Sequence, residues 1–381
     1  MSAMETVPEG LRMPPEWAPH ERTWMAWPSA GYTLGDTEEE AELARRTWAE
    51  VAAAVLRFEP VTMLVDPAAR ADAARHLPEG VEVVEVPLDD AWIRDTGPTF
   101  VHDAHGRVHA VDWTFNGWGA QSWASWEHDE HVARAVAERA GAPVVSSRMV
   151  NEGGGIHVDG EGTVLITRTV QLDEGRNPGW TEAQVEDELR RTLGARKVIW
   201  VPRGLTRDYD EFGTRGHVDI VATFAAPGTV LVHTQDDPAH PDHAVTREVA
   251  ELLRGQTDAA GRTLDVIEVP APRATHDDEG PVDYSYINHL VVNGGVILCA
   301  FGEEEADTRA ADIIGRAYPG REVVLVEARP LFARGGGIHC ITQQQPAAEA
   351  GEARADADAR AAETVVAGGG AGGAAAEGAS A

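Results

Sequence analysis

Helical and extended patterns of hydrophobic residues alternate along most of the chain. The spacing of Leu43, Val51, Val55 and Leu56 predicts an amphipathic helix with one buried face. Thr181, with Gln184 three positions later, predicts the capped start of another helix. Helices are expected over 37–58, in a short segment ending at 77, and over 127–140, 181–193, 241–253 and 303–317. Strands are expected over 61–66, 81–86, 144–145, 163–167, 198–202, 265–270 and 321–326.

The order of these elements predicts a repeated unit of strand, strand, helix and strand, roughly 50 to 70 residues long. No long polar linker divides the body, so we expect one closed domain over residues 1–346. From residue 347 to 381 the chain is mostly alanine, glycine and glutamate. Such a segment cannot bury enough apolar surface to offset its ordering entropy, which predicts a disordered tail.

Composition narrows the class of protein. The hydrophobic fraction of 43% and the eleven tryptophans indicate a folded globular chain. A net charge of −31 argues against nucleic-acid binding, which needs a basic face. The acidic field would favour a cationic small molecule, although solubility accounts for the charge as well. No segment approaches the roughly 20 apolar residues of a membrane span. With no signal-peptide pattern and two cysteines, we expect a cytoplasmic protein.

The string Gly-Gly-Gly-Ile-His occurs twice, at 153–157 and 335–339, and the second copy is followed by Cys340. A glycine run lets the backbone approach a bound group closely, because no Cβ intervenes. Polar residues after Cys340, including three glutamines, favour a partly accessible thiol. Cys299 instead lies among apolar residues and is expected in the core. Cys340 is therefore the candidate nucleophile.

Five short polar patterns lie about 60 residues apart, one in each expected unit. They contain Trp92 with Asp95, Glu152, His217 with Asp219, Asn288, and Cys340. In a radial repeat, each unit would contribute one loop or strand end to a shared axis. We therefore expect side chains that are distant in sequence to converge on one reactive centre.

His217 and Asp219 lie two residues apart, so on a strand both side chains would point to the same face. A carboxylate beside an imidazole favours the charged imidazolium and suits proton transfer near neutral pH. A hydrogen-bonded pair with a purely structural task is equally compatible with this spacing. His157 and Asp159 repeat the spacing directly after the first glycine run, and we expect them to support that loop.

A thiol, a histidine and several carboxylates together suggest covalent chemistry on a cationic carbon. Asp95 lies between Trp92 and a Thr-Gly-Pro turn, an unusual setting for a solubilising charge. Carboxylates would repel the oxyanion that develops in peptide hydrolysis. They would instead pair with the planar donors of a guanidinium group.

Longer motifs run in a fixed order along about residues 10 to 346. They include Arg-Met-Pro-Pro-Glu-Trp, Trp-Ile-Arg-Asp-Thr-Gly-Pro, Glu-Gly-Gly-Gly-Ile-His-Val-Asp, Arg-Asn-Pro, Gly-His-Val-Asp, Ser-Tyr-Ile-Asn and Ile-His-Cys-Ile-Thr-Gln-Gln. In these motifs the chain resembles the agmatine deiminases, which belong with the bacterial-type peptidyl-arginine deiminases in the guanidine-modifying superfamily. The resemblance implies an α/β fold, the pentein propeller, with five ββαβ units around a pseudo-fivefold axis.

The resemblance also implies an activity, the deimination of a small cationic guanidino substrate such as agmatine, giving N-carbamoylputrescine and ammonia. Cys340 would be the nucleophile, and His217 would protonate the departing ammonia and then activate water. Glu152 would be a further catalytic carboxylate. The residues expected to bind the substrate are Asp95, Asp219 and Trp92. The family needs no metal or organic cofactor, and association through outer helices into a homo-oligomer is expected.

Some positions depart from the family motifs. Arg215 and Gly337 stand where the family usually has aspartate and asparagine, and the stretch after Pro28 lacks a Pro-Asp-Asn-Trp-like pattern. Arg215 would favour a substrate with a carboxylate if it faces the site, but it could equally point to solvent. Arginine and peptidyl-arginine therefore remain possible substrates. The same residues would also fit a metal-dependent amidohydrolase using the two His-x-Asp pairs, or a binding protein for arginine-like ligands.

Overall fold

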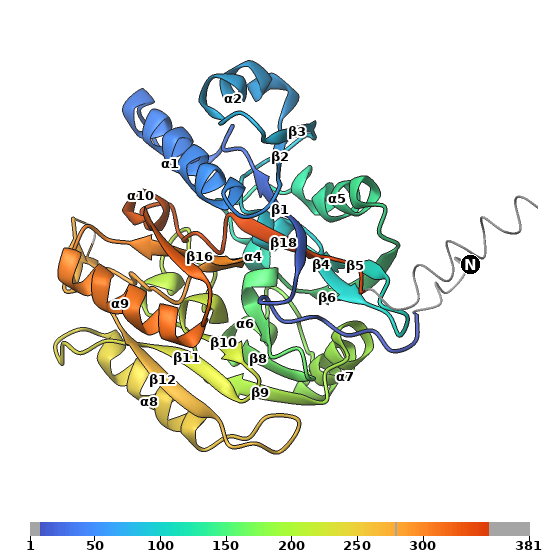
Figure 1. Cartoon of the computed structure of the whole chain (residues 1–381), viewed down its shortest axis with the longest axis vertical. Helices are drawn as coiled ribbons and strands as arrows, with labels where there is room; N and C mark the ends of the chain where they lie inside the picture. The colour runs from blue at the N-terminus through green and yellow to red at the C-terminus, as the bar shows by residue number, and fades with distance from the viewer. Residues whose placement is uncertain (1–7, 279, 350–381) are drawn as a thin grey trace, which may run out of the picture.

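Five sheets form the body of an α/β fold in the computed structural model, which describes residues 8–278 and 280–349 (Figure 1). In those ranges the strand orders are β18-β1-β2-β3, β4-β5-β6, β7-β8-β9, β10-β11-β12 and β15-β16-β17, with a separate β13-β14 pair. The longer helices lie around the periphery and the strands lie inside them (Figure 1). The expected α/β class is thereby confirmed.

Four of the sheets share one pattern. Their strands are β4 (Thr99–His102), β5 (Val108–Thr114), β6 (Val144–Val150), β7 (Ile156–Val158), β8 (Thr163–Thr167), β9 (Lys197–Val201), β10 (Ala222–Ala226), β11 (Thr229–Thr234), β12 (Asp265–Pro270), β15 (Leu290–Val292), β16 (Gly295–Ala300) and β17 (Glu322–Glu327). In each sheet the first two strands are antiparallel and the third is parallel to the second. The helices joining second to third strands are α5 (Val132–Ala140), α7 (Glu182–Leu193), α8 (Asp242–Arg254) and α9 (Glu304–Ala317). The expected order of strand, strand, helix and strand is present in all four.

The remaining large sheet joins the two ends of the described chain. It contains β1 (His20–Ala26), β2 (Val61–Val65), β3 (Glu82–Glu85) and β18 (Thr342–Pro346). The last strand, β18, is antiparallel to β1, and α1 (Glu38–Leu56) connects β1 to the parallel β2. This pairing holds the turn that carries Cys340 against the N-terminal segment.

Short elements complete the connections. They are α2 (Arg70–His76), α3 (Ile93–Thr96), α4 (Gly117–Ala120), α6 (Arg168–Gln171), α10 (Arg329–Phe332), the strands β13 (His276–Asp277) and β14 (Gly280–Pro281), and the 3₁₀ turns η1 (Tyr32–Leu34), η2 (Pro67–Ala69), η3 (Asp129–His131), η4 (Gly153–Gly155), η5 (Arg207–Tyr209) and η6 (Val218–Ile220). Several of these short elements carry the polar patterns found in the sequence.

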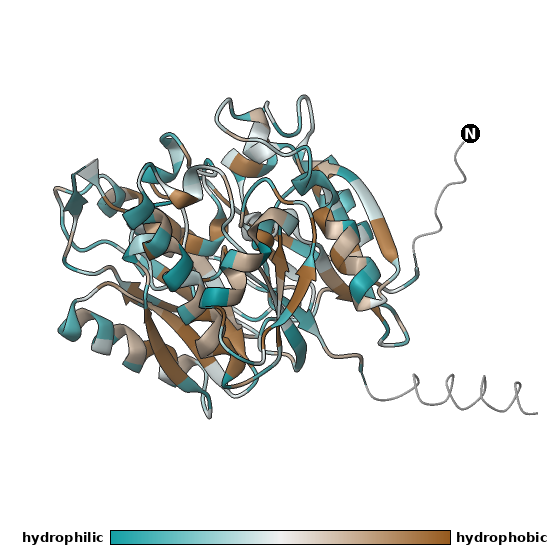
Figure 2. Ribbon diagram, turned by 90° about the horizontal axis from the view of Figure 1, so that it is seen from above, coloured by the Kyte–Doolittle hydropathy of each residue, from teal (hydrophilic) through white to brown (hydrophobic). Residues whose placement is uncertain are grey.

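Apolar strands form the interior, as the hydropathy-coloured ribbon shows (Figure 2). The middle strands β2, β8 and β16 are buried along almost their whole length. Strands covered on both faces need near-continuous apolar sequence, which these strands have. Cys299 lies in β16 with none of its surface exposed, so its predicted place in the core is confirmed.

Helix boundaries follow the capping signals. The side chain of Thr37 accepts the backbone N–H of Glu40 at the start of α1, and Thr181 and Gln184 form the expected capping box of α7. The helix expected over 127–140 is shorter than predicted, since residues 129–131 form η3 and the α-helix begins at Val132.

In the two described ranges, no helix is long and apolar enough to cross a membrane. The predicted tail, 347–381, falls mostly outside the described residues, which end at Glu349. Its first residues are tied to the body, since Ala347 N–H donates to the carbonyl of Pro19 at 2.8 Å and Glu349 N–H to that of Gly106 at 3.0 Å.

Candidate active site

Cys340 lies in the turn before β18, with its thiol beside Asn288 and Asp219. Its Sγ is 3.2 Å from Asn288 Nδ2 and 3.6 Å from Asp219 Oδ2. Only 5% of the residue is exposed, so the prediction of a partly accessible thiol is wrong. Burial, followed by the negative charges of Asp219 and Asp95, raises the pKa of the thiol well above its ordinary value. A cation placed here would favour the thiolate.

The doubled glycine string lets functional groups crowd together. A Cβ on Gly154 would stand 2.5 Å from His217 Nδ1 and 3.0 Å from both Asp95 Oδ1 and Asp219 Oδ2. A Cβ on Gly336 would stand 3.0 Å from the Cys340 sulfur. Real Cβ atoms do not approach this closely, so any larger residue would displace the groups around it. Both glycine runs therefore form part of the site.

His217 precedes η6 and contacts Glu152 more closely than Asp219. Its Nε2 is 3.2 Å from Glu152 Oε2, and its Nδ1 is 3.8 Å from Asp95 Oδ1. The prediction that His217 and Asp219 share one face of a strand is wrong, because residues 218–220 form a 3₁₀ turn. Burial would lower the pKa of His217, but Asp95 and Glu152 outweigh it and raise the pKa to about 9. The ring is therefore an imidazolium near neutral pH.

Glu152 is held by a buried arginine. Arg176 Nε lies 3.0 Å from each Glu152 carboxylate oxygen, and both side chains are fully buried. Burial would raise the pKa of Glu152, but Arg176 and then His217 outweigh it and lower the pKa to about 2. Arg176 occurs in the Arg-Asn-Pro motif, whose role could not be predicted from the residues around it.

Asp95 lies in α3, where the backbone N–H of Arg94 donates to the carbonyl of Cys340 at 3.1 Å. Its carboxylate accepts the indole N–H of Trp118 at 2.8 Å and the backbone N–H of Gly154 at 3.1 Å. Burial raises the pKa of Asp95 to about 6, although the charge of His217 opposes the rise. Among the described residues, no arginine or lysine pairs with Asp95 as Arg176 pairs with Glu152.

Asp219 ends a buried chain of charged side chains. Its Oδ2 is 2.7 Å from His339 Nδ1, and His339 Nε2 is 2.6 Å from Glu16 Oε1. Asp219 Oδ1 is buried and has no hydrogen-bond partner among the described residues. Burial would raise the pKa of Asp219, but its bond to His339 outweighs this and lowers the pKa. The roles of Glu16 and His339 were not predicted from the sequence, although both residues occur in the long ordered motifs.

The loop before His217 is organised by Asp208. This buried carboxylate accepts the backbone N–H groups of Thr214 at 2.6 Å, Gly216 at 2.6 Å and His217 at 3.1 Å. Arg215 has a φ of +69°, and its side chain pairs with Asp173 at 3.1 Å. This ion pair accounts for the charge of Arg215 without a substrate carboxylate.

The second His-x-Asp pair, His157 and Asp159, makes different contacts from His217 and Asp219. His157 Nε2 is 2.6 Å from the hydroxyl of Thr223, while its Nδ1 accepts the backbone N–H of Phe224 at 3.2 Å. Asp159 accepts the backbone N–H of Thr163 at 2.9 Å and closes a turn. Within 8–278 and 280–349, no three His, Cys, Asp or Glu side chains gather as metal ligands would. The geometry gives the amidohydrolase hypothesis no support.

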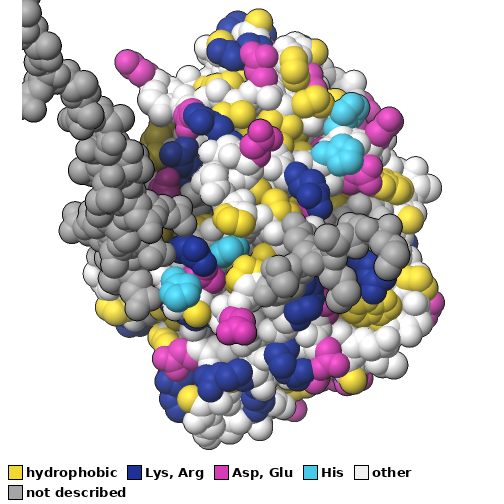
Figure 3. All heavy atoms as spheres, turned by 90° about the vertical axis from the view of Figure 1, so that its right-hand side faces the viewer, with side chains coloured by type: hydrophobic (Ala, Val, Ile, Leu, Met, Phe, Trp, Pro, Cys, Tyr) yellow, Lys and Arg dark blue, Asp and Glu magenta, His cyan; other side chains and the backbone are white. Residues whose placement is uncertain are grey.

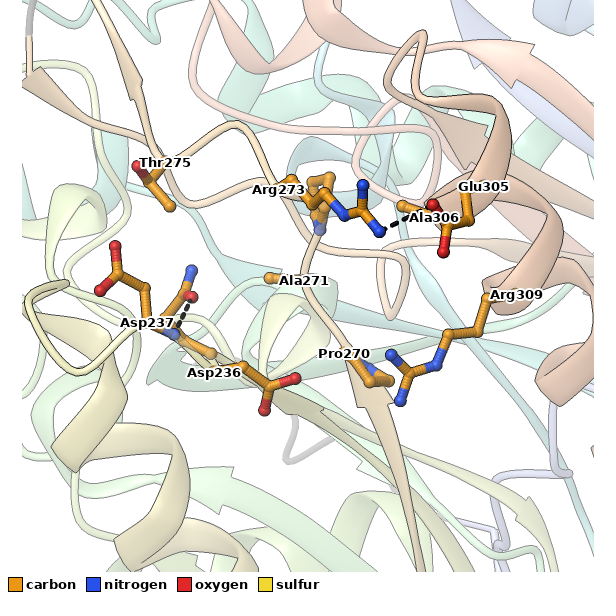
Figure 4. Close-up of a pocket in the computed structure, with 11 residues that line it drawn as sticks. Asp236, Asp237, Pro270, Ala271, Arg273, Thr275, Glu305, Ala306 and Arg309 are labelled. Atoms are coloured by element: carbon orange, nitrogen blue, oxygen red, sulfur yellow. Dashed lines mark hydrogen bonds and ion pairs between the residues drawn. The ribbon is translucent and has the colours of Figure 1, made fainter.

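A separate hollow of about 360 Å³ lies beyond the ends of β11 and β12, beside the start of α9 (Figure 4). Asp236, Arg273 and Arg309 are among its lining residues, and Arg273 is paired with Glu305 at 2.7 Å. None of the predicted site residues lines this hollow. The reactive groups are gathered elsewhere, around Gly154.

The structure brings Asp95, Glu152, His217, Asn288 and Cys340 together from segments far apart in the chain. Carboxylates can pair with guanidinium donors, a thiol can attack the central carbon, and an imidazolium can protonate a departing amine. Fold and site together define an enzyme of the guanidine-modifying class.

Comparisons with known proteins place the chain more narrowly. Residues 12–346 match the Porphyromonas-type peptidyl-arginine deiminase family, and the chain belongs to that family. A protein of Streptomyces coelicolor is 62% identical over 337 residues, which cover 88% of this chain and 99% of the relative. The agmatine deiminase of Medicago truncatula is 39% identical, covering 91% of this chain and 100% of the relative. The solved agmatine deiminase of Enterococcus faecalis has 33% identity and a TM-score of 0.84, covering 91% of this chain and 100% of that structure.

Proposed function

We propose that this protein hydrolyses agmatine to N-carbamoylputrescine and ammonia. The observation that carries the proposal is the convergence of the buried Cys340 thiol, the His217 imidazolium and three carboxylates around Gly154. Relatives that are 39% and 40% identical over nearly their whole length are named agmatine deiminases. The net charge of −31 also suits a dication as substrate.

The guanidinium group binds between Asp95 and Asp219, with Trp92 beside it. Both carboxylates are buried, and Asp219 Oδ1 has no hydrogen-bond partner in the described part of the chain. A planar cation would supply the N–H donors and charge that these groups lack. The same cation lowers the pKa of the nearby Cys340 thiol, which releases its proton to solvent and becomes the nucleophile.

In the first half of the reaction, the thiolate attacks the guanidinium carbon and forms a carbon–sulfur bond. The attack uses the positive charge of the guanidinium and gives a neutral tetrahedral intermediate. His217 then donates its proton to one amino nitrogen, and the carbon–nitrogen bond breaks to release ammonia. A cationic S-amidino group remains on Cys340, and His217 is left neutral.

In the second half, neutral His217 takes a proton from water as the water oxygen attacks the amidino carbon. The carbon–sulfur bond breaks, the electron pair returns to sulfur, and the carbamoyl product loses its extra proton to the thiolate. Glu152 keeps the imidazole oriented through the 3.2 Å contact with Nε2. Arg176 holds Glu152 ionised, so that His217 regains its charge for the next cycle.

A substrate panel tests the proposal. We expect ammonia and a ureido product from agmatine, and much less from arginine or an arginyl peptide. Cys340→Ala should lower kcat roughly 10³-fold or more, because the covalent route is lost. Activity should also survive a chelator. A wild-type enzyme that turns over arginine or arginyl peptides but not agmatine would replace the named substrate. One that binds agmatine without turnover would point to a binding protein.

The arrangement of the whole molecule follows the same proposal. We infer that the five sheets stand around a pseudo-fivefold axis as a propeller of ββαβ units within one catalytic domain. Supporting this are the repeated strand order, the β18–β1 pairing and the helices at the periphery (Figure 1). We also infer that the protein is cytoplasmic, that it forms a homo-oligomer, and that it has no nucleic-acid partner. On the face seen in Figure 3, basic and acidic side chains are interspersed.

A further inference from the structure

Four aromatic rings from three loops lie in contact beside the catalytic residues. The ring of Tyr32 stacks on Phe212 with centroids 4.6 Å apart and meets the edge of Trp123 at 4.9 Å. Trp123 in turn stacks on Trp118 at 5.2 Å. Tyr32 comes from η1, the two tryptophans from the segment after β5, and Phe212 from the loop that carries His217.

This cluster runs from the reactive centre to the surface. At its inner end the Trp118 N–H donates to Asp95 at 2.8 Å, and Trp92 stacks with Tyr32 at 6.5 Å. Trp92 also borders Gly336, next to the thiol. A Cβ on Gly336 would stand 2.7 Å from the Trp92 ring and 3.0 Å from the Cys340 sulfur. At its outer end Phe212 is 36% exposed. A chain extending outward from a bound guanidinium would therefore pass these rings.

One carboxylate beside this path has no counter-ion among the described residues. Asp90 is 8% exposed and precedes Trp92 by two residues. Its Oδ1 accepts the hydroxyl of Thr33 and the backbone N–H of Ala91, the latter at 2.8 Å. No Lys, Arg or His side chain in the described ranges forms an ion pair with it. A buried carboxylate without such a partner is costly, and a cation that reaches it is bound correspondingly well.

Tyr32 precedes Thr33, whose hydroxyl donates to Asp90, and its ring stacks with Trp92 beside the reactive centre. The charges of Asp90, Asp95 and Cys340 all help burial to raise the pKa of the Tyr32 hydroxyl. Burial likewise raises the pKa of Asp90 to about 7, against its hydrogen bonds from Thr33 and Ala91. The indole N–H of Trp92 lies near both groups and opposes the rise in the pKa of each. The region thus offers a group of aromatic rings and an acidic oxygen to a cation supplied by a ligand.

We propose that Asp90 and the ring of Tyr32 bind the primary ammonium group at the far end of the substrate, and so select an ω-aminoalkyl guanidine. This assignment rests on the proposed deimination of agmatine. An ammonium group pairs with a carboxylate and also with the face of an aromatic ring. Arginine would bring its α-carboxylate to the same place, where Asp90 repels it. The site therefore favours the decarboxylated compound.

The test compares agmatine with n-pentylguanidine, in which a methyl group replaces the ammonium. The wild type should prefer agmatine in kcat/KM. Asp90→Asn should lower kcat/KM for agmatine about ten- to hundredfold, as removal of one member of a buried charge pair does, while changing that for n-pentylguanidine little. The matched control is Asp89→Asn. This neighbouring acid pairs with His128 at 2.9 Å, so the preference for agmatine should remain.

A second pair of variants keeps the proposal testable if Asp90→Asn does not fold. Tyr32→Phe should retain the preference for agmatine, and Tyr32→Leu should reduce it roughly two- to thirtyfold, the range of a cation–π contact. Equal losses on both substrates would show a structural role and overturn the proposal, as would a wild type that does not prefer agmatine to n-pentylguanidine. If no guanidine is turned over at all, the proposed function fails instead.

Discussion

At the scale of single residues, the three site carboxylates differ in protonation because their neighbours differ. Arg176 faces Glu152 and lowers its pKa to about 2, after offsetting the effect of burial. Asp95 has no arginine partner among the described residues, and burial raises its pKa to about 6. One carboxylate is therefore permanently charged, while another is stabilised as an anion chiefly when a cation arrives. That difference suits a site which must bind a guanidinium group and release a neutral ureido group.

The same neighbours make stability depend on pH through His217. Its folded pKa of about 9 lies above its ordinary value, so its interactions with Asp95 and Glu152 stabilise the fold fully at low pH. This contribution should be lost as pH rises from about 6.5 through about 9, and amounts to no more than about 3 kcal/mol. Urea unfolding at pH 6 and pH 10 checks this, with His217→Gln as the reference. A wild type whose stability advantage over that variant does not shrink at high pH would contradict it.

At the scale of elements, the site depends on loops and 3₁₀ turns that are held in place by contacts with other segments of the chain. The turn η6 directs Asp219 towards His339, and His339 contacts Glu16 in the segment before β1. Arg94 joins the group, since its Nε donates to the carbonyl of His339 at 3.1 Å. We infer that Glu16 and the His339 ring position the Asp219 carboxylate, whose Oδ1 has no hydrogen-bond partner among the described residues.

Glu16→Gln should therefore weaken the site without unfolding the protein. Removing the negative charge weakens the contact that holds the His339 ring and, through it, Asp219, so kcat/KM should fall about tenfold. A lower pKa of His339 should also move the acid-to-neutral part of the pH–rate profile, which a purely structural role would not do. Glu21→Gln, a neighbouring acid in β1 with its side chain half exposed, is the control. An unchanged profile in Glu16→Gln would argue against the positioning role.

At the scale of the whole molecule, the sheet of β18 and β1 closes the fold. β18 contributes all of its residues to the interior, and Cys340 lies just before it. The segment after Glu349 is expected from its composition to add little to a packed core. The position of the nucleophile therefore depends on pairing between the two ends of the described chain.

Two truncations distinguish these parts. A chain ending after Glu349 should keep its melting temperature within a few degrees and its full kcat. A chain ending after Ile341 should be insoluble or inactive, because β1 loses its partner and becomes an exposed edge. Thermal unfolding and agmatine turnover measure both. A soluble, active product of the shorter truncation would contradict the dependence on β18.

Local patterns explain how much of this could be predicted from the sequence. Thr37 and Thr181 mark helix starts because capping bonds join residues three positions apart. The polarity of the neighbouring residues predicted burial correctly for Cys299 but not for Cys340, because tertiary packing buries both thiols. The polar pattern around Asn288 stood out, but nothing local showed that its amide would face the Cys340 sulfur.

By itself, the sequence determined the α/β repeat, the capped helices and the candidate nucleophile, since each depends on short-range spacing or on long ordered motifs. Only the tertiary structure decided which groups meet. It pairs His217 with Glu152 rather than Asp219, because residues 218–220 turn instead of extending. It also joins Glu16 to His339 across 323 positions. Contacts made across sheets leave no spacing pattern in the chain, so packing alone reveals them.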